Sequence, residues 1–151
     1  RVLDPEGTFT ISQSILRRYC RKAQVTLHVS DLWKALDKDG DGRAAFEEVV
    51  VESAVVLAQF QHWAQERLGS CAAVWDSPEA VAARKRKQGN TWSSEKKMLL
   101  GQFADALHAL AWPRIGEPAA KSLLLSSLDS YGCGLIVRTD LEWLYKWKTP
   151  E

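Results

Sequence analysis

Apolar residues recur at intervals of three and four along most of the chain, which is the spacing of helices with one buried side. In the first half, this pattern predicts a helix over 11–19 whose opposite side is cationic. It also predicts a short helix at 32–36, for which Ser30 is a suitable N-cap. A longer apolar stripe runs over 46–68 and stops at Gly69, which predicts one continuous helix of about six turns.

The second half shows the same helical spacing in shorter segments. Pro78 and Pro118 each suit the first turn of a helix, and the apolar residues of 98–110 predict another helix between them. Thr139 and Glu142 have the spacing of a capping box for a last helix. The pattern therefore predicts an all-α fold.

One stretch between two predicted helices, residues 37–48, places carboxylates at alternate positions. Gly42 follows them, at a point where a tight turn disfavours a Cβ. Ca²⁺ takes about six to eight oxygen ligands at roughly 2.3–2.6 Å, and such a loop supplies them when it curls around the ion. Without a cation, the crowded carboxylates would repel one another. We therefore predict a calcium site whose ligands are the side chains of Asp37, Asp39, Asp41 and Glu48 and the main-chain carbonyl of Arg43.

The loop at 37–48 resembles the calcium loop of the EF-hand superfamily, with Gly42 at the sixth position and Glu48 at the twelfth. The resemblance implies paired EF-hands, which are helix-loop-helix units, in two lobes as in calmodulin and troponin C. Ala44 and Ala45 depart from the family's pattern at the eighth and ninth positions. We expect one Ca²⁺ ion with a dissociation constant of about 10⁻⁶–10⁻⁴ M, and Mg²⁺ as the alternative occupant at rest. The competing interpretation is a plain polar turn between two helices.

The resemblance also suggests that residues 2–13 are a degenerate partner loop. This stretch repeats the shape of the main loop, with Gly7 followed two residues later by Phe9. Val2 and Gln13 stand where the first and last carboxylates belong, so we expect no ion there. A simple Asp-Pro turn that leads into a helix is the alternative.

Residues 129–140 resemble a second EF-hand loop that has lost its ligands, with Gly134 at the sixth position and Ile136 at the eighth. Cys133 replaces one of the middle carboxylates, so we expect this loop to fold without an ion. A role for Cys133 as ligand of a softer metal lacks companion ligands. A third remnant is suggested at 84–95, where cations stand in place of carboxylates.

These segments imply three regions. Residues 1–68 would be an EF-hand pair with one intact loop, 69–90 a connecting helix and basic linker, and 91–151 a degenerate lobe with an empty loop. Four consecutive cations at 84–87 favour a solvated linker over a nuclear-import signal or a contact with an acidic partner.

Composition narrows the partners and the compartment. The chain of 151 residues has a net charge of +1, which argues against nucleic acid or a membrane surface as its main partner. No apolar run approaches the roughly 20 residues of a membrane span, so no membrane insertion is expected. Three cysteines without CxxC spacing, and no signal peptide, favour a reducing compartment such as the cytoplasm. Because Arg1 is not a start methionine, we expect a processed product or part of a longer protein.

The chain shows no nucleophile–base pairing, phosphate-binding glycine loop or zinc signature, so we expect it not to be an enzyme. His62 and Glu66 share a helix face, but such a pair usually belongs to the surface or the core. We expect a calcium-responsive module that binds a protein partner, either a helix or a larger complex. The alternative is a structural, light-chain-like subunit docked permanently in a larger assembly, because the chain has one methionine, Met98, and seven rigid tryptophans.

Overall fold

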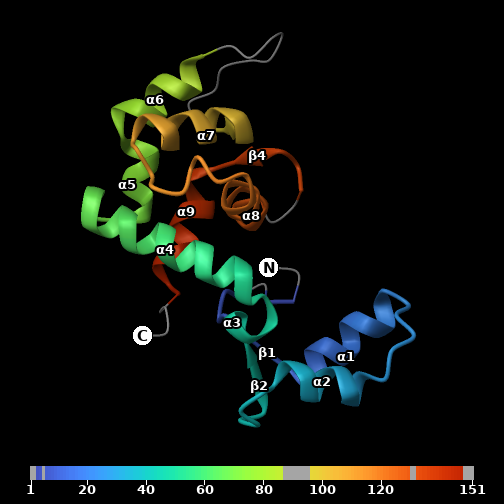
Figure 1. The fold of residues 1–151 in the computed structure, drawn as a ribbon. Helices are drawn as coiled ribbons and strands as arrows, with labels where there is room; N and C mark the ends of the chain where they lie inside the picture. The colour runs from blue at the N-terminus through green and yellow to red at the C-terminus, as the bar shows by residue number, and fades with distance from the viewer. Residues whose placement is uncertain (1–2, 5, 87–95, 130–131, 148–151) are drawn as a thin grey trace. The chain divides into compact units, whose positions relative to one another are not determined.

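The protein is mostly helical, with two small antiparallel sheets of two strands each, so the all-α prediction is confirmed at this level (Figure 1). By its internal contacts, the chain divides into unit 1, Arg1–Val55, and unit 2, Val56–Glu151. No described helix is long and apolar enough to cross a membrane. The computed structural model describes residues 3–4, 6–86, 96–129 and 132–147.

Unit 1 combines three short helices with a pair of strands. Its elements are β1 (Thr10–Ser12), α1 (Gln13–Lys22), α2 (Val29–Leu36), β2 (Arg43–Ala45), α3 (Phe46–Val49) and the start of α4 (Val51–Leu68). The two strands pair antiparallel, with Ile11 opposite Ala44 (Figure 1). This pairing brings the segment before α1 against the loop that follows α2.

The starts of the two main helices of unit 1 differ. Ser12 caps α1, because its Oγ accepts the N–H of Ile15 at 3.4 Å. The predicted N-cap at Ser30 is wrong, since α2 begins at Val29 and Ser30 lies inside it. The N–H groups of Asp31 and Leu32 already donate to the carbonyl of His28, at 3.1 Å each, so the helix winds from His28 onward.

The core of unit 1 is small. One buried cluster consists of Ile11, Leu16, Cys20, Trp33 and Ala44, and Phe9 and Ala54 are also buried. The apolar residues packed around this cluster are only partly buried: Leu3, Ile15, Val29, Leu32, Leu36 and Val49. Unit 1 therefore leaves much of its apolar surface near water.

The predicted continuous helix over 46–68 is wrong, because it is broken at Val50. This residue has φ −136° and ψ 68°, outside the helical region, and its N–H donates to the carbonyl of Phe46 at 3.0 Å. Three successive β-branched residues at 49–51, which are stiff at χ1, weaken helix propensity there. The predicted end is confirmed: α4 stops at Leu68, and Gly69 follows with φ +90°.

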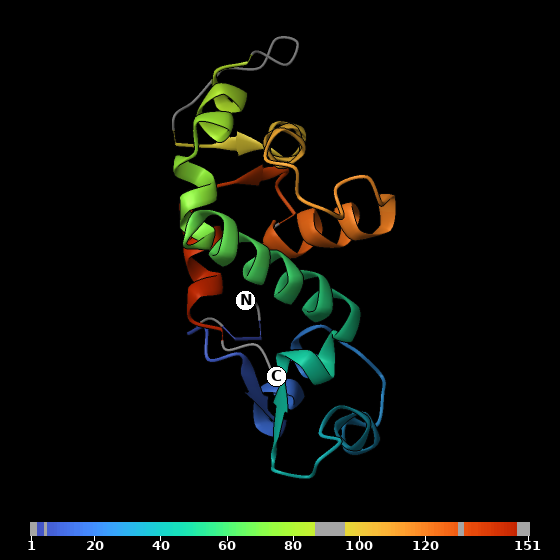
Figure 2. The same ribbon diagram turned by 60° about the vertical axis from the view of Figure 1, so that its left-hand side comes forward.

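Unit 2 contains the rest of α4 and a second strand pair. Its further elements are α5 (Cys71–Asp76), α6 (Pro78–Lys85), β3 (Met98–Leu99), α7 (Leu100–Ala109), α8 (Pro118–Leu128), β4 (Leu135–Ile136) and α9 (Arg138–Tyr145). β3 and β4 pair antiparallel, and Met98 lies opposite Ile136 (Figure 2). The predicted first-turn positions of Pro78 and Pro118 are confirmed.

Aromatic rings join α4 to the core of unit 2. Phe60 is fully buried, and its ring centroid lies 6.3 Å from that of Phe103 and 6.0 Å from that of Trp112. Both contacts are edge-to-face, an arrangement that stabilises beyond the area it buries. The boundary between the two units falls inside α4, between Val55 and Val56.

Two local expectations in unit 2 are corrected. Arg84 is not part of a solvated basic run: it is buried, its guanidinium lies 4.4 Å from the centre of the Trp75 ring, and it donates to the Trp75 carbonyl at 2.7 Å. The cap of α9 lies two residues before the predicted capping box at Thr139. There, the Asp140 carboxylate accepts the N–H of Val137 at 2.9 Å.

Candidate metal centre

Three carboxylates converge in the loop between α2 and β2. Asp37, Asp39 and Asp41 each place an oxygen within 4.8 Å of the other two, and no other such group of His, Cys, Asp or Glu occurs among the described residues. Asp37 directly follows α2, and its N–H donates to the carbonyl of Trp33 at 2.8 Å, so the helix fixes where the loop begins. The structure thus brings together three of the predicted ligands.

Hydrogen bonds inside the loop hold its curl. Asp39 Oδ1 accepts the N–H of Asp41 at 3.1 Å, and Asp41 Oδ1 accepts the N–H of Arg43 at 2.7 Å. Such bonds between an aspartate and the backbone two residues on are typical of turns. Gly42 has φ +84°, a left-handed conformation that a residue with a Cβ adopts at a cost.

Asp37 carries the clearest signal of a cation site. Its Oδ2 accepts the N–H of Gly42 at 3.1 Å, but its Oδ1 is buried and has no hydrogen-bond donor. A buried acceptor without a partner costs roughly 1–3 kcal/mol, and more when it is charged. A cation bound to Asp37 through Oδ1 would satisfy this oxygen.

The two remaining predicted ligands, Arg43 and Glu48, lie outside the group of three aspartates. Arg43 begins β2 with an exposed side chain, so its carbonyl is the oxygen it can offer to an ion. Glu48 lies outside the group of three, and its Oε2 accepts the N–H of Ala45 at 2.8 Å. Its carboxylate therefore caps α3 in this structure, and coordination by Glu48 stays a prediction.

The strand register changes the predicted partner loop over 2–13. Because Ile11 lies opposite Ala44, the pairing residue is Ile11 and not Phe9, a shift of two residues. The same count places Asp4 where Asp37 stands in the main loop, and it places Phe9 where Gly42 stands. Phe9 indeed has φ +60°.

Asp4 closes its own loop through hydrogen bonds. One carboxylate oxygen accepts the N–H and the hydroxyl of Thr8, both at 2.9 Å, and the other accepts the N–H of Phe9 at 2.6 Å. Sequence reasoning missed this role because it placed the first loop position at Val2, which lies outside the described residues. An aspartate four residues before a threonine was the available signal.

The loop at 129–140 is closed in the same way. Asp129 accepts the N–H groups of Cys133 at 3.0 Å and of Gly134 at 2.8 Å. Desolvation raises the pKa of Asp129, but hydrogen bonds from Gly134, Cys133 and Gly132 together hold that pKa below its usual value. This carboxylate is thus satisfied by donors of its own loop.

The suggested remnant at 84–95 is only partly visible. Its first residues, Arg84 and Lys85, belong to α6, and 87–95 lie outside the described residues. Met98 lies opposite Ile136, the predicted pairing position of the loop at 129–140.

The other candidate metal ligands, His62, Glu66 and Cys133, do not form a metal site among the described residues. His62 Nε2 and Glu66 Oε1 lie 3.3 Å apart, but both side chains are mostly exposed, at 73% and 70%. Cys133 is exposed, and its nearest polar neighbours are Asp129 and the Leu135 carbonyl. Neither position gathers a third ligand within the part of the chain that the structure describes.

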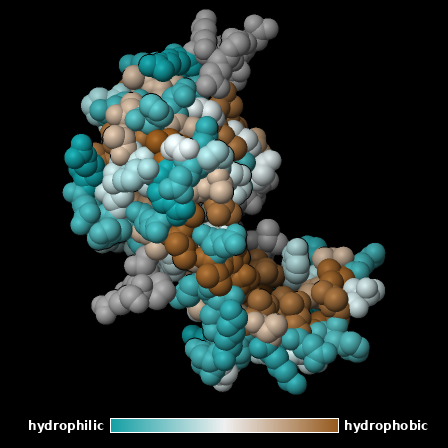
Figure 3. Space-filling view, viewed as in Figure 1, coloured by the Kyte–Doolittle hydropathy of each residue, from teal (hydrophilic) through white to brown (hydrophobic). Residues whose placement is uncertain are grey.

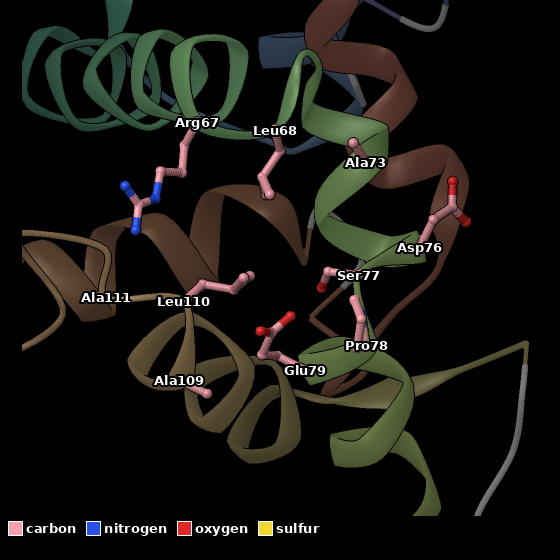
Figure 4. A pocket seen from close by; sticks show the side chains of 10 residues that line it. All are labelled: Arg67, Leu68, Ala73, Asp76, Ser77, Pro78, Glu79, Ala109, Leu110 and Ala111. Atoms are coloured by element: carbon pink, nitrogen blue, oxygen red, sulfur yellow. The ribbon is translucent and has the colours of Figure 1, made fainter.

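An open pocket of about 500 Å³ lies in unit 2, at the ends of α4 and α7 (Figure 4). Arg67 and Glu79 line it from different helices. The Ser77 hydroxyl donates to the Val74 carbonyl at 2.7 Å and accepts the N–H of Ala80, so it serves as a helix cap. The lining therefore offers no nucleophile paired with a base.

Comparison with protein-family models, with curated proteins and with solved structures found no match.

Proposed function

We propose that this chain is a calcium-binding protein of the EF-hand type, with one Ca²⁺ site at 37–48. The observation that carries the proposal is the buried, donor-free Oδ1 of Asp37 among three converging carboxylates. Support also comes from the antiparallel pairing of this loop with the segment before α1, since EF-hands work in pairs. The Arg43 carbonyl and Glu48 would complete the oxygen shell.

The donor set favours calcium over other cations. All predicted ligands are oxygens, which suits hard cations rather than zinc or copper. The loop is exposed and is held by a few internal hydrogen bonds, and Ca²⁺ tolerates such flexible geometry, whereas Mg²⁺ demands a near-ideal octahedron. We expect a dissociation constant of about 10⁻⁶–10⁻⁴ M, with Mg²⁺ as the weaker competitor.

Calcium binding would act on α3. In the proposed switch, the Glu48 carboxylate turns from the Ala45 N–H, which it accepts at 2.8 Å, toward the ion. Because Glu48 lies in the single turn of α3, this change would reorient α3 against α1 and α2 and alter access to the small core of unit 1. The proposed function is therefore a calcium-responsive module that binds a protein partner.

The alternative is a structural subunit in which calcium only stabilises. It is supported by unit 2, where Trp75, Trp112 and Trp147 are buried and Asp129 accepts two N–H groups of its own loop. Such a unit suits a fixed docking role. The two functions share the calcium site and differ in whether the ion opens unit 1.

Calorimetric titration of the full chain with Ca²⁺ tests the site. Glu48→Gln should weaken binding at least about tenfold, because it removes a charged ligand from the shell. Glu47→Gln is the matched control, since Glu47 precedes Glu48 in α3 and has no predicted contact with the ion. Equal calcium binding by the two variants would show that the assignment of Glu48 is wrong.

Trp33 separates the two functions, because it is the only tryptophan of unit 1 and belongs to its core. A responsive module should change the NMR signal of the Trp33 indole and bind an apolar dye at the calcium concentration that fills the site. A structural subunit should gain thermal stability with neither change. Trp112, buried in unit 2, is the internal reference.

A further inference from the structure

Among the residues that the structure describes, unit 1 exposes more large apolar side chains than unit 2. Among the described residues of unit 1, these are Tyr19, Val25, Leu27, Val50, Val51 and Val55. Figure 3 shows apolar residues gathered over α3, the first turn of α4 and α1. Contiguous exposed apolar surface of this kind usually marks an interaction site.

The edge of this surface on α1 is cationic. Leu16 and Cys20 are buried, whereas Tyr19 is 41% exposed and Ile15 is half-buried, so the apolar stripe of α1 has one open edge. Residues three apart are neighbours on a helix surface. Arg18 follows Ile15 by three residues and Lys22 follows Tyr19 by three, so both cations lie along the open edge.

The cations of α1 are exposed and form no ion pair with the residues that the structure describes. The helix carries Arg17, Arg18, Arg21 and Lys22 and no acidic residue, and all four are exposed. None of them forms an ion pair with another residue that the structure describes. An acidic partner would meet them without displacing an existing contact.

We propose that unit 1 docks an amphipathic helix of a partner protein, with acidic residues of that helix along the Arg18–Lys22 edge. This inference rests on the proposed function and names the partner that the module takes. The exposed apolar residues lie mainly on helices and their connections rather than along a strand edge, which favours packing of side chains against a helix over strand addition.

Charges at the other end of the surface favour a protein helix over an anionic membrane. Glu47 and Glu52 lie beside the exposed Val50, Val51 and Val55 on α3 and α4. An anionic lipid surface would attract α1 and repel this end. A helix can match both ends, because acidic residues on it need to face only α1.

The first test compares two synthetic amphipathic helices with the same leucine face, one with glutamate and one with lysine flanking it. Binding to the calcium-loaded full chain is measured by fluorescence anisotropy. The glutamate peptide should bind about two- to thirtyfold more tightly, the range for two exposed ion pairs. This preference should shrink as salt is added. Equal or tighter binding of the lysine peptide would overturn the proposal.

A matched pair of variants tests the edge itself. The double variant Arg18→Glu, Lys22→Glu should lose the preference for the glutamate peptide. The double variant Arg17→Glu, Arg21→Glu makes the same charge change beside the buried edge of the apolar stripe. This variant should keep most of the preference for the glutamate peptide. Circular dichroism confirms that both variants are folded. Equal losses would mean that only net charge matters, and would overturn the proposal.

Other occupants are outcomes of the same experiments. Binding to vesicles of anionic lipid in preference to both peptides, or dimers that exclude the glutamate peptide, would overturn the proposal. Calcium calorimetry on the same samples keeps the two proposals apart. If calcium binds but the peptides are not distinguished, only the partner inference fails. If calcium does not bind, the proposed function fails.

Discussion

Phe9 holds a conformation that residues with a Cβ rarely adopt. It has φ +60°, and its side chain is buried with its ring edge-to-face against Phe46 at 6.5 Å. A left-handed residue with a Cβ costs about 1–2 kcal/mol. The burial of the ring offsets this strain.

The strain at Phe9 predicts that a glycine variant is more stable than an alanine variant, the reverse of the usual order. Both Phe9→Ala and Phe9→Gly should destabilise unit 1 by about 3–5 kcal/mol through loss of the ring. The glycine variant should be the more stable by about 1 kcal/mol, because glycine adopts positive φ freely. Denaturant unfolding, followed by the NMR signal of the Trp33 indole, measures both. A more stable alanine variant would contradict the backbone argument.

Cys71 has an unusually weak acidity for a residue at a helix start. It is the first residue of α5, a position that favours the thiolate, yet burial raises the pKa of its thiol from 9.0 to about 11. Between these values the unfolded chain loses the proton and the folded chain keeps it. The free energy of unfolding should therefore fall as the pH rises from about 9 to 11.

Two measurements check this prediction. The pH dependence of urea unfolding should become flatter between about 9 and 11 in Cys71→Ala than in the parent chain. Near neutral pH, an alkylating reagent should modify the exposed Cys133 well before the buried Cys71. Faster modification of Cys71 would contradict the raised pKa.

At the scale of elements, one buried amide ties α4 to the end of α9. Gln61 donates from Nε2 to the carbonyls of Leu144 at 2.8 Å and Trp147 at 3.0 Å. The Leu144 carbonyl also accepts the N–H of Trp147 at 3.1 Å, so Gln61 adds a second donor there and reaches the Trp147 carbonyl beyond the end of α9.

Removing this amide should weaken unit 2. Gln61→Leu keeps the volume but removes the buried side-chain donor from both carbonyls, although Leu144 still accepts the N–H of Trp147, and it should cost about 1–3 kcal/mol. Gln65→Leu is the control, because Gln65 lies one turn further along α4 and is exposed, and it should change stability by less than about 0.5 kcal/mol. Thermal unfolding measures both. A similar loss in the two variants would contradict a specific role for Gln61.

The sequence predicted elements well where one residue type determines the local geometry. Pro78 and Pro118 mark helix starts and Gly69 marks the end of α4, because proline and glycine restrict or free the backbone directly. The carboxylate spacing at 37–48 likewise identified the residues that the structure brings together.

Sequence-based prediction failed where a residue adopts a conformation or an environment that is unusual for its type. Phe9 has a positive φ, a conformation that is expected of glycine. The sequence therefore suggested Gly7 for this position, and the register of the first loop was placed two residues early. The break at Val50 was missed because an apolar stripe has the same spacing on both sides of one non-helical residue. Burial of Arg84 against Trp75 depends on contacts across helices, which charge patterning does not reveal.

For the whole molecule, the distribution of satisfied carboxylates predicts where calcium acts. Asp129 already has its donors, whereas Asp37 has an oxygen without one. A ligand present at 100 times its dissociation constant stabilises the form that binds it by about 2.7 kcal/mol. Calcium should therefore slow amide hydrogen exchange in 10–12 and 37–49 and leave unit 2 unchanged.

Exchange measured by mass spectrometry with and without calcium tests this restriction. Glu48→Gln is the control, and it should lose most of the effect at the same calcium concentration. Equal slowing across α5 to α9 would show that the ion acts on both units, which is contrary to the prediction.

The break at Val50 has a consequence for how far a local signal spreads. Since α3 and α4 are separate helices, two torsion angles at one residue suffice to swivel the four residues of α3 while α4 keeps its axis. The aromatic cluster around Phe60 would then feel no torque from the ion site. A single continuous helix through Val50 would transmit a rotation of α3 directly to α4. Because Val50 is not helical, it can act as a hinge between the two helices.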